Sequence, residues 1–528
     1  MGSPGPALRP VRLSALCSRI PPPPWPGASR GLTARTATPE GTAKLRTMDQ
    51  LPGPSQTTTL YWLFWRGYGD RSHALQGVQK ALYGPMWRSR FGPFDMVNVA
   101  SADLIAQVIR QEGRYPVRAP LPHWKEYRDL RGQAYGLHVD TGPEWYRIRS
   151  ALNPRMLKPR EAAAFAPVLH QVVSDLLRRI QDLRNRSPDR TTVSDVTAEL
   201  YKFGFEGISS ILFETRLGCL QEDIPQDTLR FISAVNSMLT LSEVVVLLPR
   251  WTRRVLPFWT RFVRAWDDLY DVAQSLIDRR VSEMEGQVSG GQVSEGMYLS
   301  YLLSSDKLSR AEVSISVTEL LLGGVDTTSN TLSWSLYHLA RDQRVQDRLY
   351  QEVDSVCPDR REPTTQDLTQ MPYLKAVIKE TLRLYPVVPG NGRFVSENEV
   401  ILDGYWFPKK TQFHLCHYAV LHDEAEFVNA ESFVPERWLR TPGGGASPRG
   451  GASPGSFRHH PYSFIPFGVG VRACVGKRVA ELEMYLALSR LVQHYQLRPA
   501  DGAGTVEPKT RTLLIPSAPI NLRFLSRA

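Results

Sequence analysis

Long stretches of helical periodicity set the fold class of this 528-residue chain. Apolar residues recur at helical spacing over residues 160–186, 259–285 and 309–341, and Ser309 and Glu312 form a capping box at the start of the third stretch. Short β-branched or aromatic stretches, such as residues 399–407 and 512–516, are scattered between them. This pattern predicts a mainly α-helical fold with small peripheral β-sheets, not an alternating β/α fold.

The first 48 residues differ in composition from the rest. They hold seven Arg or Lys residues against one acid, Glu40, and are rich in Ser, Thr, Pro and Ala. An Arg-rich, hydroxyl-rich and acid-poor segment is typical of a mitochondrial transit peptide. The alternative is a disordered basic tail without a targeting signal, and the proline run at residues 21–24 is untypical of a transit helix.

The rest of the composition is that of a globular protein, with 42% hydrophobic and 22% charged residues. The five cysteines are few, odd in number and widely spaced, so we expect no disulfide framework, no zinc site and a reducing compartment. No run reaches the roughly 18 apolar residues of a membrane-spanning helix. We expect residues 1–48 to be a transit peptide, 49–57 a linker and 58–528 a single large domain with a flexible Gly/Ser/Pro loop at 441–457.

Residues 247–266 combine aromatic and basic side chains. Trp251, Trp259 and Trp266 lie among five arginines in an otherwise apolar segment. Basic and aromatic residues at helical spacing fit a monotopic contact with a membrane surface. An ordinary amphipathic helix pair with its apolar face inward fits equally well.

The most informative stretch is residues 467–476, where Cys474 stands in a glycine-studded loop beside Arg472 and ahead of a helical pattern. A nearby cation and a helix N-terminus lower the pKa of a thiol, and backbone N–H groups can donate to its sulfur. The glycines permit backbone angles and close approach that a Cβ would prevent. These features predict a thiolate bound to a large planar metal cofactor; a buried structural cysteine is the alternative.

A second unusual stretch, residues 323–328, lies inside the longest helical pattern. Its two glycines cost about 1 kcal/mol each in a helix interior, so a flat cofactor or O₂ pressed against the backbone would explain them. Asp326 and Thr327 place an acid and a hydroxyl at this thin point, which suits proton delivery. A helix–helix contact through small residues is the alternative.

Together these stretches resemble the haem-binding loop and the oxygen-activating motif of the cytochromes P-450. The motifs of that family occur in order over residues 58–528. Further stretches resemble its mitochondrial sterol 27-hydroxylase and vitamin D hydroxylase branch: residues 83–87, 110–113, 216–220, 326–332 and 386–393. The resemblance implies the cytochrome P-450 fold, haem b as cofactor and Cys474 as the thiolate ligand of the iron. Gly323, where alanine is commoner, and the Gly/Ser/Pro repeat depart from the family and leave substrate preference open.

The resemblance also implies roles for individual residues near the haem. Thr327 would position the activated oxygen and its waters, and Asp326 would help to relay protons. The arginines of the haem contacts would neutralise the two propionates. The implied haem contacts are Trp145, Arg149, Arg393, Phe467, Gly470, Arg472, Cys474 and Gly476.

Two further groups have implied supporting roles. Glu380, Arg383 and Arg437 would form a buried charged triad beneath the haem loop, although a solvent-exposed i,i+3 pair is the alternative for the first two. A basic patch would steer a small iron–sulfur ferredoxin to the protein, with a solvated charged face as the alternative. Its members would be Lys375, Lys379, Lys477 and Arg478.

The implied function is a haem-thiolate monooxygenase that hydroxylates a sterol side chain, with cholesterol, bile-acid precursors or vitamin D as substrates. Electrons would come from NADPH through a ferredoxin reductase and an adrenodoxin-type mitochondrial ferredoxin. The protein would contact the matrix side of the inner mitochondrial membrane and bind no nucleic acid. The alternatives are a vitamin D-specific 1α- or 25-hydroxylase, a non-catalytic haem-thiolate sensor or carrier, and a helical protein without a cofactor. A sensor or carrier would need no proton relay, so Asp326 and Thr327 argue against it.

Overall fold

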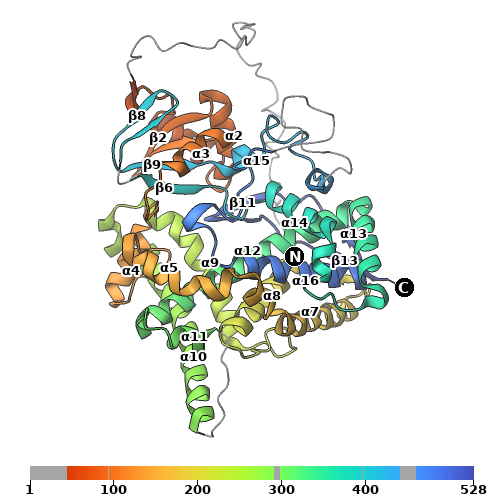
Figure 1. Ribbon diagram of the computed structural model, residues 1–528. Helices are drawn as coiled ribbons and strands as arrows, with labels where there is room; N and C mark the ends of the chain where they lie inside the picture. Colours follow the sequence, from red (N-terminus) through yellow and green to blue (C-terminus); the bar gives the residue numbers. More distant parts are fainter. Residues whose placement is uncertain (1–44, 93, 290–297, 396–397, 440–458, 528) are drawn as a thin grey trace, which may run out of the picture. The chain divides into compact units, whose positions relative to one another are not determined.

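The structure is a computed structural model that describes residues 45–92, 94–289, 298–395, 398–439 and 459–527 (Figure 1). The predicted Gly/Ser/Pro loop at 441–457 and all but the last residues of the predicted transit peptide lie outside the described residues. From Leu45 onward the described residues belong to one folded unit.

Helices make up most of this unit, as the sequence predicts. The α-helices of the described residues are α1 (Gln56–Leu60), α2 (Ser72–Tyr83), α3 (Ala102–Arg110), α4 (Pro122–Arg131), α5 (Gly142–Leu157), α6 (Pro159–Ala163), α7 (Ala166–Arg186), α8 (Val196–Leu212), α9 (Gln226–Leu247), α10 (Pro257–Ser289), α11 (Leu299–Leu303), α12 (Arg310–Arg341), α13 (Gln343–Val356), α14 (Pro372–Leu384), α15 (His417–Leu421) and α16 (Lys477–His494).

The strands are short and form small sheets. They are β1 (Arg46–Thr47), β2 (Met86–Phe91), β3 (Phe94–Val99), β4 (Val117–Arg118), β5 (Thr192–Val193), β6 (Asn391–Val395), β7 (Val400–Leu402), β8 (Tyr405–Phe407), β9 (Thr411–Leu415), β10 (Tyr495–Pro499), β11 (Pro508–Arg511), β12 (Leu513–Pro516) and β13 (Leu522–Ser526). The largest sheet has the order β2-β3-β9-β6-β4, in which β3 and β9 are parallel and the other neighbours antiparallel. The smaller sheets have the orders β1-β8-β7, β10-β13-β5 and β11-β12.

Helix α12 runs through the main hydrophobic core, with α8, α10, α14 and α16 packed against it (Figure 1). Its predicted capping box is confirmed: the Glu312 N–H donates to the Ser309 hydroxyl, and the Glu312 carboxylate accepts from the Ser309 N–H at 2.8 Å. The strand predicted at residues 512–516 is confirmed as β12. The helix predicted over residues 160–186 is divided into α6 and α7, because Pro167 opens a new helix.

The folded unit begins earlier than the sequence predicts. Strand β1 pairs in parallel with β8, and the guanidinium of Arg46 lies 3.9 Å from the centre of the Tyr405 ring. The Ser55 hydroxyl then caps α1 by accepting from the Thr58 N–H. Residues 45–57 therefore belong to the folded unit and do not form a separate linker.

Helix α9 corrects the expectation that no segment could span a membrane. Among the described residues it is the one helix long and apolar enough to do so, by length and composition. Its residues Phe231, Val235, Met238 and Leu239 are buried in the main core, and α10 packs along it. One face of α9 therefore packs into the core, which accounts for part of its apolar composition, since 39% of its most apolar stretch is buried.

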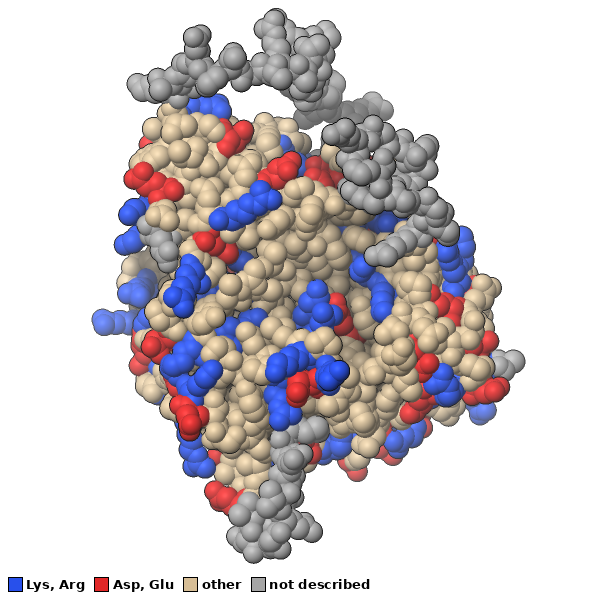
Figure 2. Space-filling model, in the orientation of Figure 1, with Lys and Arg blue, Asp and Glu red and all other residues tan. Residues whose placement is uncertain are grey.

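Charge is mixed over the surface. On the face shown in Figure 2, Lys and Arg side chains alternate with Asp and Glu, and uncharged areas lie between them. On that face the excess of basic residues is not gathered into the continuous stripe that is typical of a nucleic-acid site.

Candidate functional site at the cysteine loop and helix α12

The cysteine loop closes on itself through backbone hydrogen bonds. The Cys474 N–H donates to the Phe467 carbonyl at 2.8 Å, and the Ala473 N–H donates to Gly470 at 3.1 Å. Gly468 and Gly470 have φ angles of 69° and 71°, in the left-handed region that favours glycine. Gly476 needs no such angle; it forms the N-cap of α16, and a Cβ there would meet nothing within 4 Å.

The pKa of the Cys474 thiol is raised, because burial disfavours the thiolate. The Gly476 N–H and the cations Arg149, Arg118 and Lys477 act in the opposite direction. The sequence predicts a lowered pKa, and that prediction is wrong for the protein alone, because burial outweighs the cations. A metal bonded to the sulfur would displace the proton.

A metal at this loop would have to bring its other ligands with it. In the described part of the chain, no group of three or more His, Cys, Asp or Glu residues could hold a metal ion. One thiolate without protein co-ligands fits a metal whose remaining positions are filled by a macrocycle.

Four arginines surround the cysteine loop: Arg118 on β4, Arg149 on α5, Arg393 on β6 and Arg472 in the loop itself. We call them the arginine cluster. Arg472 donates to the carbonyls of Pro116 at 2.7 Å, Asp140 at 3.2 Å and Leu137 at 3.4 Å, and Arg149 donates to the carbonyl of Ala473 at 2.6 Å. Arg393 forms an ion pair with Glu112. The Arg118 Nε is buried without a hydrogen-bond partner in the described residues.

The arginine cluster has too few anions. Among the described residues only Arg393 has a carboxylate in direct ion pair, and backbone carbonyls carry no compensating charge. Burial, followed by Arg118, Arg393 and Arg149, lowers the pKa of Arg472 to about 9. Burial also lowers the pKa of Arg149, to about 10, and that of Arg118, which Arg393 depresses further. A ligand with two carboxylates, as haem has, would supply the missing anions.

The two predicted aromatic contacts lie against cations. The Arg472 guanidinium is 3.6 Å from the centre of the buried Trp145 ring, so Trp145 fixes the plane of that guanidinium. Lys477 Nζ lies 5.5 Å from the centre of the Phe467 ring. Direct contact of either ring with a cofactor stays a prediction.

The two glycines in α12 have different neighbours. A Cβ at Gly324 would come within 2.8 Å of Ile208 on α8, so this glycine permits the close packing of two helices. A Cβ at Gly323 would meet nothing within 4 Å, and Gly323 is exposed although Leu322 and Val325 are buried. The interpretation as a helix–helix contact therefore holds for Gly324. Gly323 has open space beside the helix, and a ligand in that space stays a prediction.

Thr327 and Asp326 have different partners. The Thr327 hydroxyl donates to the Gly323 carbonyl at 2.7 Å. Asp326 is buried, accepts from Arg511 on β11 at 2.7 Å and is hydrogen-bonded by the Tyr201 hydroxyl on α8. Neither partner could be found from the sequence, because Tyr201 and Arg511 lie more than a hundred residues away on other elements. The predicted proton relay through Asp326 requires this ion pair to open.

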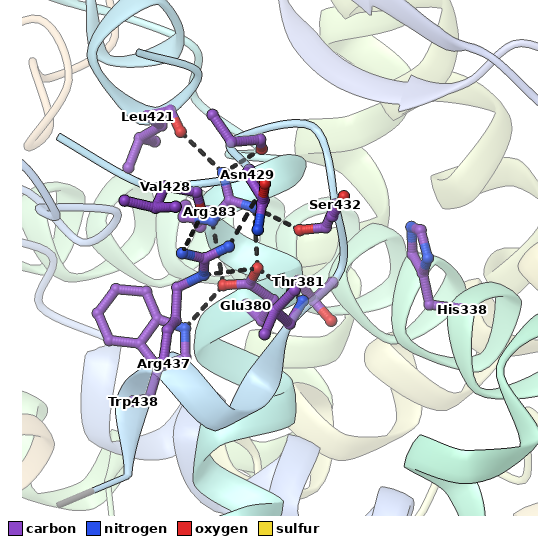
Figure 3. Close-up of polar contacts among 12 residues, drawn as sticks. His338, Glu380, Thr381, Arg383, Leu421, Val428, Asn429, Ser432, Arg437 and Trp438 are labelled. Atoms are coloured by element: carbon purple, nitrogen blue, oxygen red, sulfur yellow. Dashed lines mark hydrogen bonds and ion pairs between the residues drawn. The ribbon is translucent and has the colours of Figure 1, made fainter. Parts of the chain in front are cut away.

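The predicted triad of Glu380, Arg383 and Arg437 lies together in the core (Figure 3). Arg383 binds the Glu380 carboxylate through two hydrogen bonds of 2.8 and 3.0 Å, and Arg437 donates to it at 3.1 Å. The remaining Arg383 donors reach the carbonyls of Leu421, Ala430 and Ser432. Glu380 and Arg383 are fully buried, so the alternative of a solvent-exposed pair is wrong.

The four residues of the predicted basic patch come from two helices that pack on each other, α14 and α16. Lys379 and Arg478 are exposed, and burial lowers the pKa of the partly buried Lys375. Lys477 and Arg478 lie 3.9 and 3.3 Å from Glu481, so part of their charge is balanced. Binding of a ferredoxin here stays a prediction.

Comparison with known proteins identifies the family. The sequence pattern of the cytochrome P-450 family matches residues 51–524. The chain is 46% identical to mitochondrial sterol 26-hydroxylase of Rattus norvegicus over 489 residues, which are 92% of this chain and 90% of the rat protein. Identity to the Homo sapiens protein of the same name is 45% over 508 residues, with 95% and 92% covered. Identity to mitochondrial 25-hydroxyvitamin D-1 alpha hydroxylase of Homo sapiens is 42% over 490 residues, with 91% and 93% covered.

These matches confirm the predicted resemblance, the mainly helical fold and the haem cofactor. The fit of the cysteine loop and the arginine cluster to a dicarboxylate macrocycle agrees with them. The chain belongs to the cytochrome P-450 family of haem-thiolate monooxygenases.

Proposed function

We propose that this protein is a mitochondrial monooxygenase that hydroxylates the side chain of a sterol. The observation that carries the proposal is the identity of 46% to a mitochondrial sterol 26-hydroxylase across 92% of the chain. A vitamin D 1α- or 25-hydroxylase is the second candidate, supported by the identity of 42% to a 25-hydroxyvitamin D-1 alpha hydroxylase.

In this proposal the protein binds two parts of the haem, its propionates and its iron. Arg118, Arg149 and Arg472 would bind the propionates, and Arg393 would remain tied mainly to Glu112. Cys474 would supply the thiolate, with the Gly476 N–H donating to its sulfur. When bound, the haem supplies oxygen activation and oxidation of the C–H bond.

The residues of α12 would manage protons beside the haem. Gly323 leaves room for a small ligand next to its carbonyl, to which the Thr327 hydroxyl donates. Rotation of that hydroxyl would let it donate to a water or to an oxygen atom instead. Asp326 would exchange protons with this region when its ion pair with Arg511 opens.

Turnover by the reconstituted enzyme tests the proposal. Purified protein, a mitochondrial-type ferredoxin, its NADPH-dependent reductase and NADPH would be incubated with cholesterol, with bile-alcohol intermediates or with vitamin D. We expect oxygen insertion into the sterol side chain, located by mass spectrometry. Hydroxylation of vitamin D alone, on its ring or on its side chain, would favour the second candidate. Absence of any product from a haem-loaded enzyme that the ferredoxin reduces would contradict both.

The redox partner in this proposal docks on the patch of Lys375, Lys379, Lys477 and Arg478. Because opposite charges steer association, Lys379→Glu should raise the KM for ferredoxin about tenfold at low salt, with a smaller effect at high salt. Lys409→Glu is the matched control, since Lys409 is an exposed lysine between β8 and β9. Equal effects of the two variants would contradict docking at the patch.

We also propose that the protein lies on the matrix side of the inner membrane and that its transit peptide ends before β1, because Arg46 and Thr47 pair with β8 in the folded unit. Exposed aromatic side chains support a peripheral membrane contact: Trp65 and Phe64 are 83% and 76% exposed, and Trp251 is 70% exposed. Trp266 is fully buried and Trp259 is partly buried, so Trp251 is the one exposed tryptophan of the segment 247–266.

Vesicle binding and import test these placements. The double variant Trp65→Ser with Trp251→Ser should bind phospholipid vesicles more weakly, whereas Ile401→Ser, at an exposed apolar residue of β7, should not. Residues 1–48 fused to a reporter should direct it into mitochondria. A cytosolic reporter, or equal vesicle binding by all variants, would contradict the respective placement.

A further inference from the structure

A buried ion pair joins the core helix α12 to α4. Glu319 of α12 and Arg128 of α4 have fully buried side chains, and Arg128 Nη2 lies 3.6 Å from Glu319 Oε1. The Arg128 guanidinium lies 4.3 Å from the centre of the Trp266 ring and donates to the Gln133 side-chain oxygen at 2.8 Å. The pair lies outside the haem contacts implied by the sequence, and the reaction proposed above does not use it.

Glu319 also holds the turn that precedes α5. The His138 N–H donates to Glu319 Oε2 at 3.1 Å, and His138 Nδ1 lies 3.1 Å from the same oxygen. A Cβ at Gly136 would lie 2.3 Å from Glu319 Oε2, so this close approach requires glycine. The Asp140 N–H donates to the Gly136 carbonyl at 2.9 Å and closes the turn. We call residues 136–140 the anchored turn.

The anchored turn supplies two of the three carbonyls that hold Arg472. The Arg472 guanidinium donates to the carbonyls of Asp140 and Leu137 in the turn at 3.2 and 3.4 Å. The third carbonyl is that of Pro116, at 2.7 Å. A guanidinium binds a carboxylate best when its planar donors are already aligned, because ordering a flexible side chain costs free energy. The position of the turn therefore determines where the remaining Arg472 donors point.

Charge strengthens the hold of Glu319 on the anchored turn. Burial disfavours the carboxylate, but His138 and Arg128 outweigh it and hold the pKa of Glu319 below its usual value. The ionised carboxylate therefore accepts the His138 N–H through a charge-assisted hydrogen bond. Burial and Arg393 lower the pKa of Arg118, and Glu319 opposes that shift, so the charge of Glu319 reaches the arginine cluster.

We propose that Glu319 is a positioning residue for the haem: it fixes the anchored turn to α12, and the turn aims Arg472 at a propionate. In this role Glu319 acts through Arg472. The inference rests on the proposed binding of a propionate by Arg472 and not on the choice of substrate. The ion pair of Arg128 and Glu319 should therefore matter more for the retention of haem than for the stability of the haem-free protein.

The first experiment replaces the whole ion pair by apolar residues. Arg128→Met with Glu319→Leu leaves neither charge buried without its partner, so the haem-free protein should unfold at about the wild-type denaturant concentration. The anchored turn loses its acceptor, so haem should pass from the full-length holoenzyme to an acceptor protein about tenfold faster, the equivalent of one charge-assisted hydrogen bond. Arg186→Met with Glu222→Leu, at an exposed ion pair, is the matched control and should lose haem at the wild-type rate.

A variant of Arg472 shows whether the effect passes through that residue. Arg472→Met alone should lose haem about 10- to 100-fold faster than wild type. Replacing the ion pair as well should add less than about twofold, because effects that act through one contact are not additive. A further tenfold increase would overturn the inference, since the pair would then act independently of Arg472. Wild-type haem loss by Arg472→Met would refute the proposed propionate contact, and the inference with it.

The second experiment displaces the anchored turn without removing a charge. Gly136 has no left-handed φ angle, so the strain in Gly136→Ala comes from the methyl group against the Glu319 carboxylate, which Arg128 and His138 hold in place. Haem loss should be about threefold faster or more, and amide hydrogen exchange over residues 133–141 should be faster than in wild type. Gly77→Ala on α2, where a Cβ would meet nothing within 4 Å, is the control.

Two results would overturn the proposal directly. One is haem loss at the wild-type rate after replacement of the ion pair. The other is wild-type haem loss and hydrogen exchange in Gly136→Ala. If the variant of the ion pair does not fold, Gly136→Ala decides alone.

Discussion

Two regions of this molecule bury arginines, and they differ in how the charge is balanced. Around Glu380, the guanidinium groups of Arg383 and Arg437 share one carboxylate and several backbone carbonyls. Around Cys474, Glu112 is the single carboxylate of the described residues that forms an ion pair with the arginine cluster, and the members of the cluster lower one another's pKa. Burial is similar in the two regions, whereas the supply of anions is not.

The difference separates a structural site from a ligand site. The Glu380 region is complete within the protein, so its charges hold α14 to the segment after α15. The arginine cluster lacks matching anions among the described residues, so we expect it to bind an acidic ligand. The deficit of anions beside buried cations is therefore the observation on which we base the expected haem contacts.

The largest effect should come from Glu380→Ala. This change leaves Arg383 and Arg437 buried without a counter-ion and should lower the free energy of unfolding by about 3–5 kcal/mol. Denaturant unfolding of the purified protein measures it, with Glu222→Ala as the exposed control. If Glu380→Ala lowered the free energy of unfolding no more than the control does, Glu380 would not be the counter-ion that stabilises Arg383 and Arg437.

Removing a cation from the arginine cluster should not lower the stability of the haem-free protein, in contrast to the loss of Glu380. Arg118→Met relieves repulsion from Arg393, so the haem-free protein should unfold at an equal or higher denaturant concentration. Haem should dissociate about 10- to 100-fold faster, the equivalent of a charge-assisted hydrogen bond. Transfer of haem to an acceptor protein measures the rate. Unchanged haem loss together with lower stability would make Arg118 a structural residue.

Thr327→Ala should leave both regions intact, because Thr327 bonds only to its own helix. Haem content and the carbon monoxide spectrum should match wild type. Product formed per NADPH should fall about tenfold, and the missing electrons should appear as hydrogen peroxide. Fully coupled turnover by this variant would contradict a role for Thr327 in proton delivery.

The smallest effect should come from Trp145→Phe. The Arg472 guanidinium rests on this ring at 3.6 Å, and phenylalanine offers it a weaker cation–π contact. Haem should dissociate about threefold faster, with little change in the stability of the haem-free protein. An effect as large as that of Arg118→Met would mean that Trp145 touches the haem directly.

Short motifs explain which parts of the site could be predicted. Cys474 and Thr327 lie in local patterns that indicate their chemistry, whereas the triad of Glu380 was implied by the resemblance to the family. The capping box predicted the start of α12. Helical periodicity predicted the fold class, although it joined α6 to α7 across Pro167.

Contacts between distant segments explain what the sequence could not predict. Arg118 and Arg511 sit in short strands with no distinguishing pattern, and their roles come from partners on other elements. The sequence predicts a lowered pKa for Cys474, whereas burial raises it, and burial depends on distant segments that its neighbours in sequence do not reveal.

The carbon monoxide difference spectrum of the reduced protein tests the central claim most directly. Wild type should give the absorption band of a thiolate-ligated haem, and so should Cys416→Ser, which changes a buried cysteine outside the loop. Cys474→Ser should lose that band. Retention of the thiolate band in Cys474→Ser, or its loss in Cys416→Ser alone, would contradict the assignment of the haem to the cysteine loop.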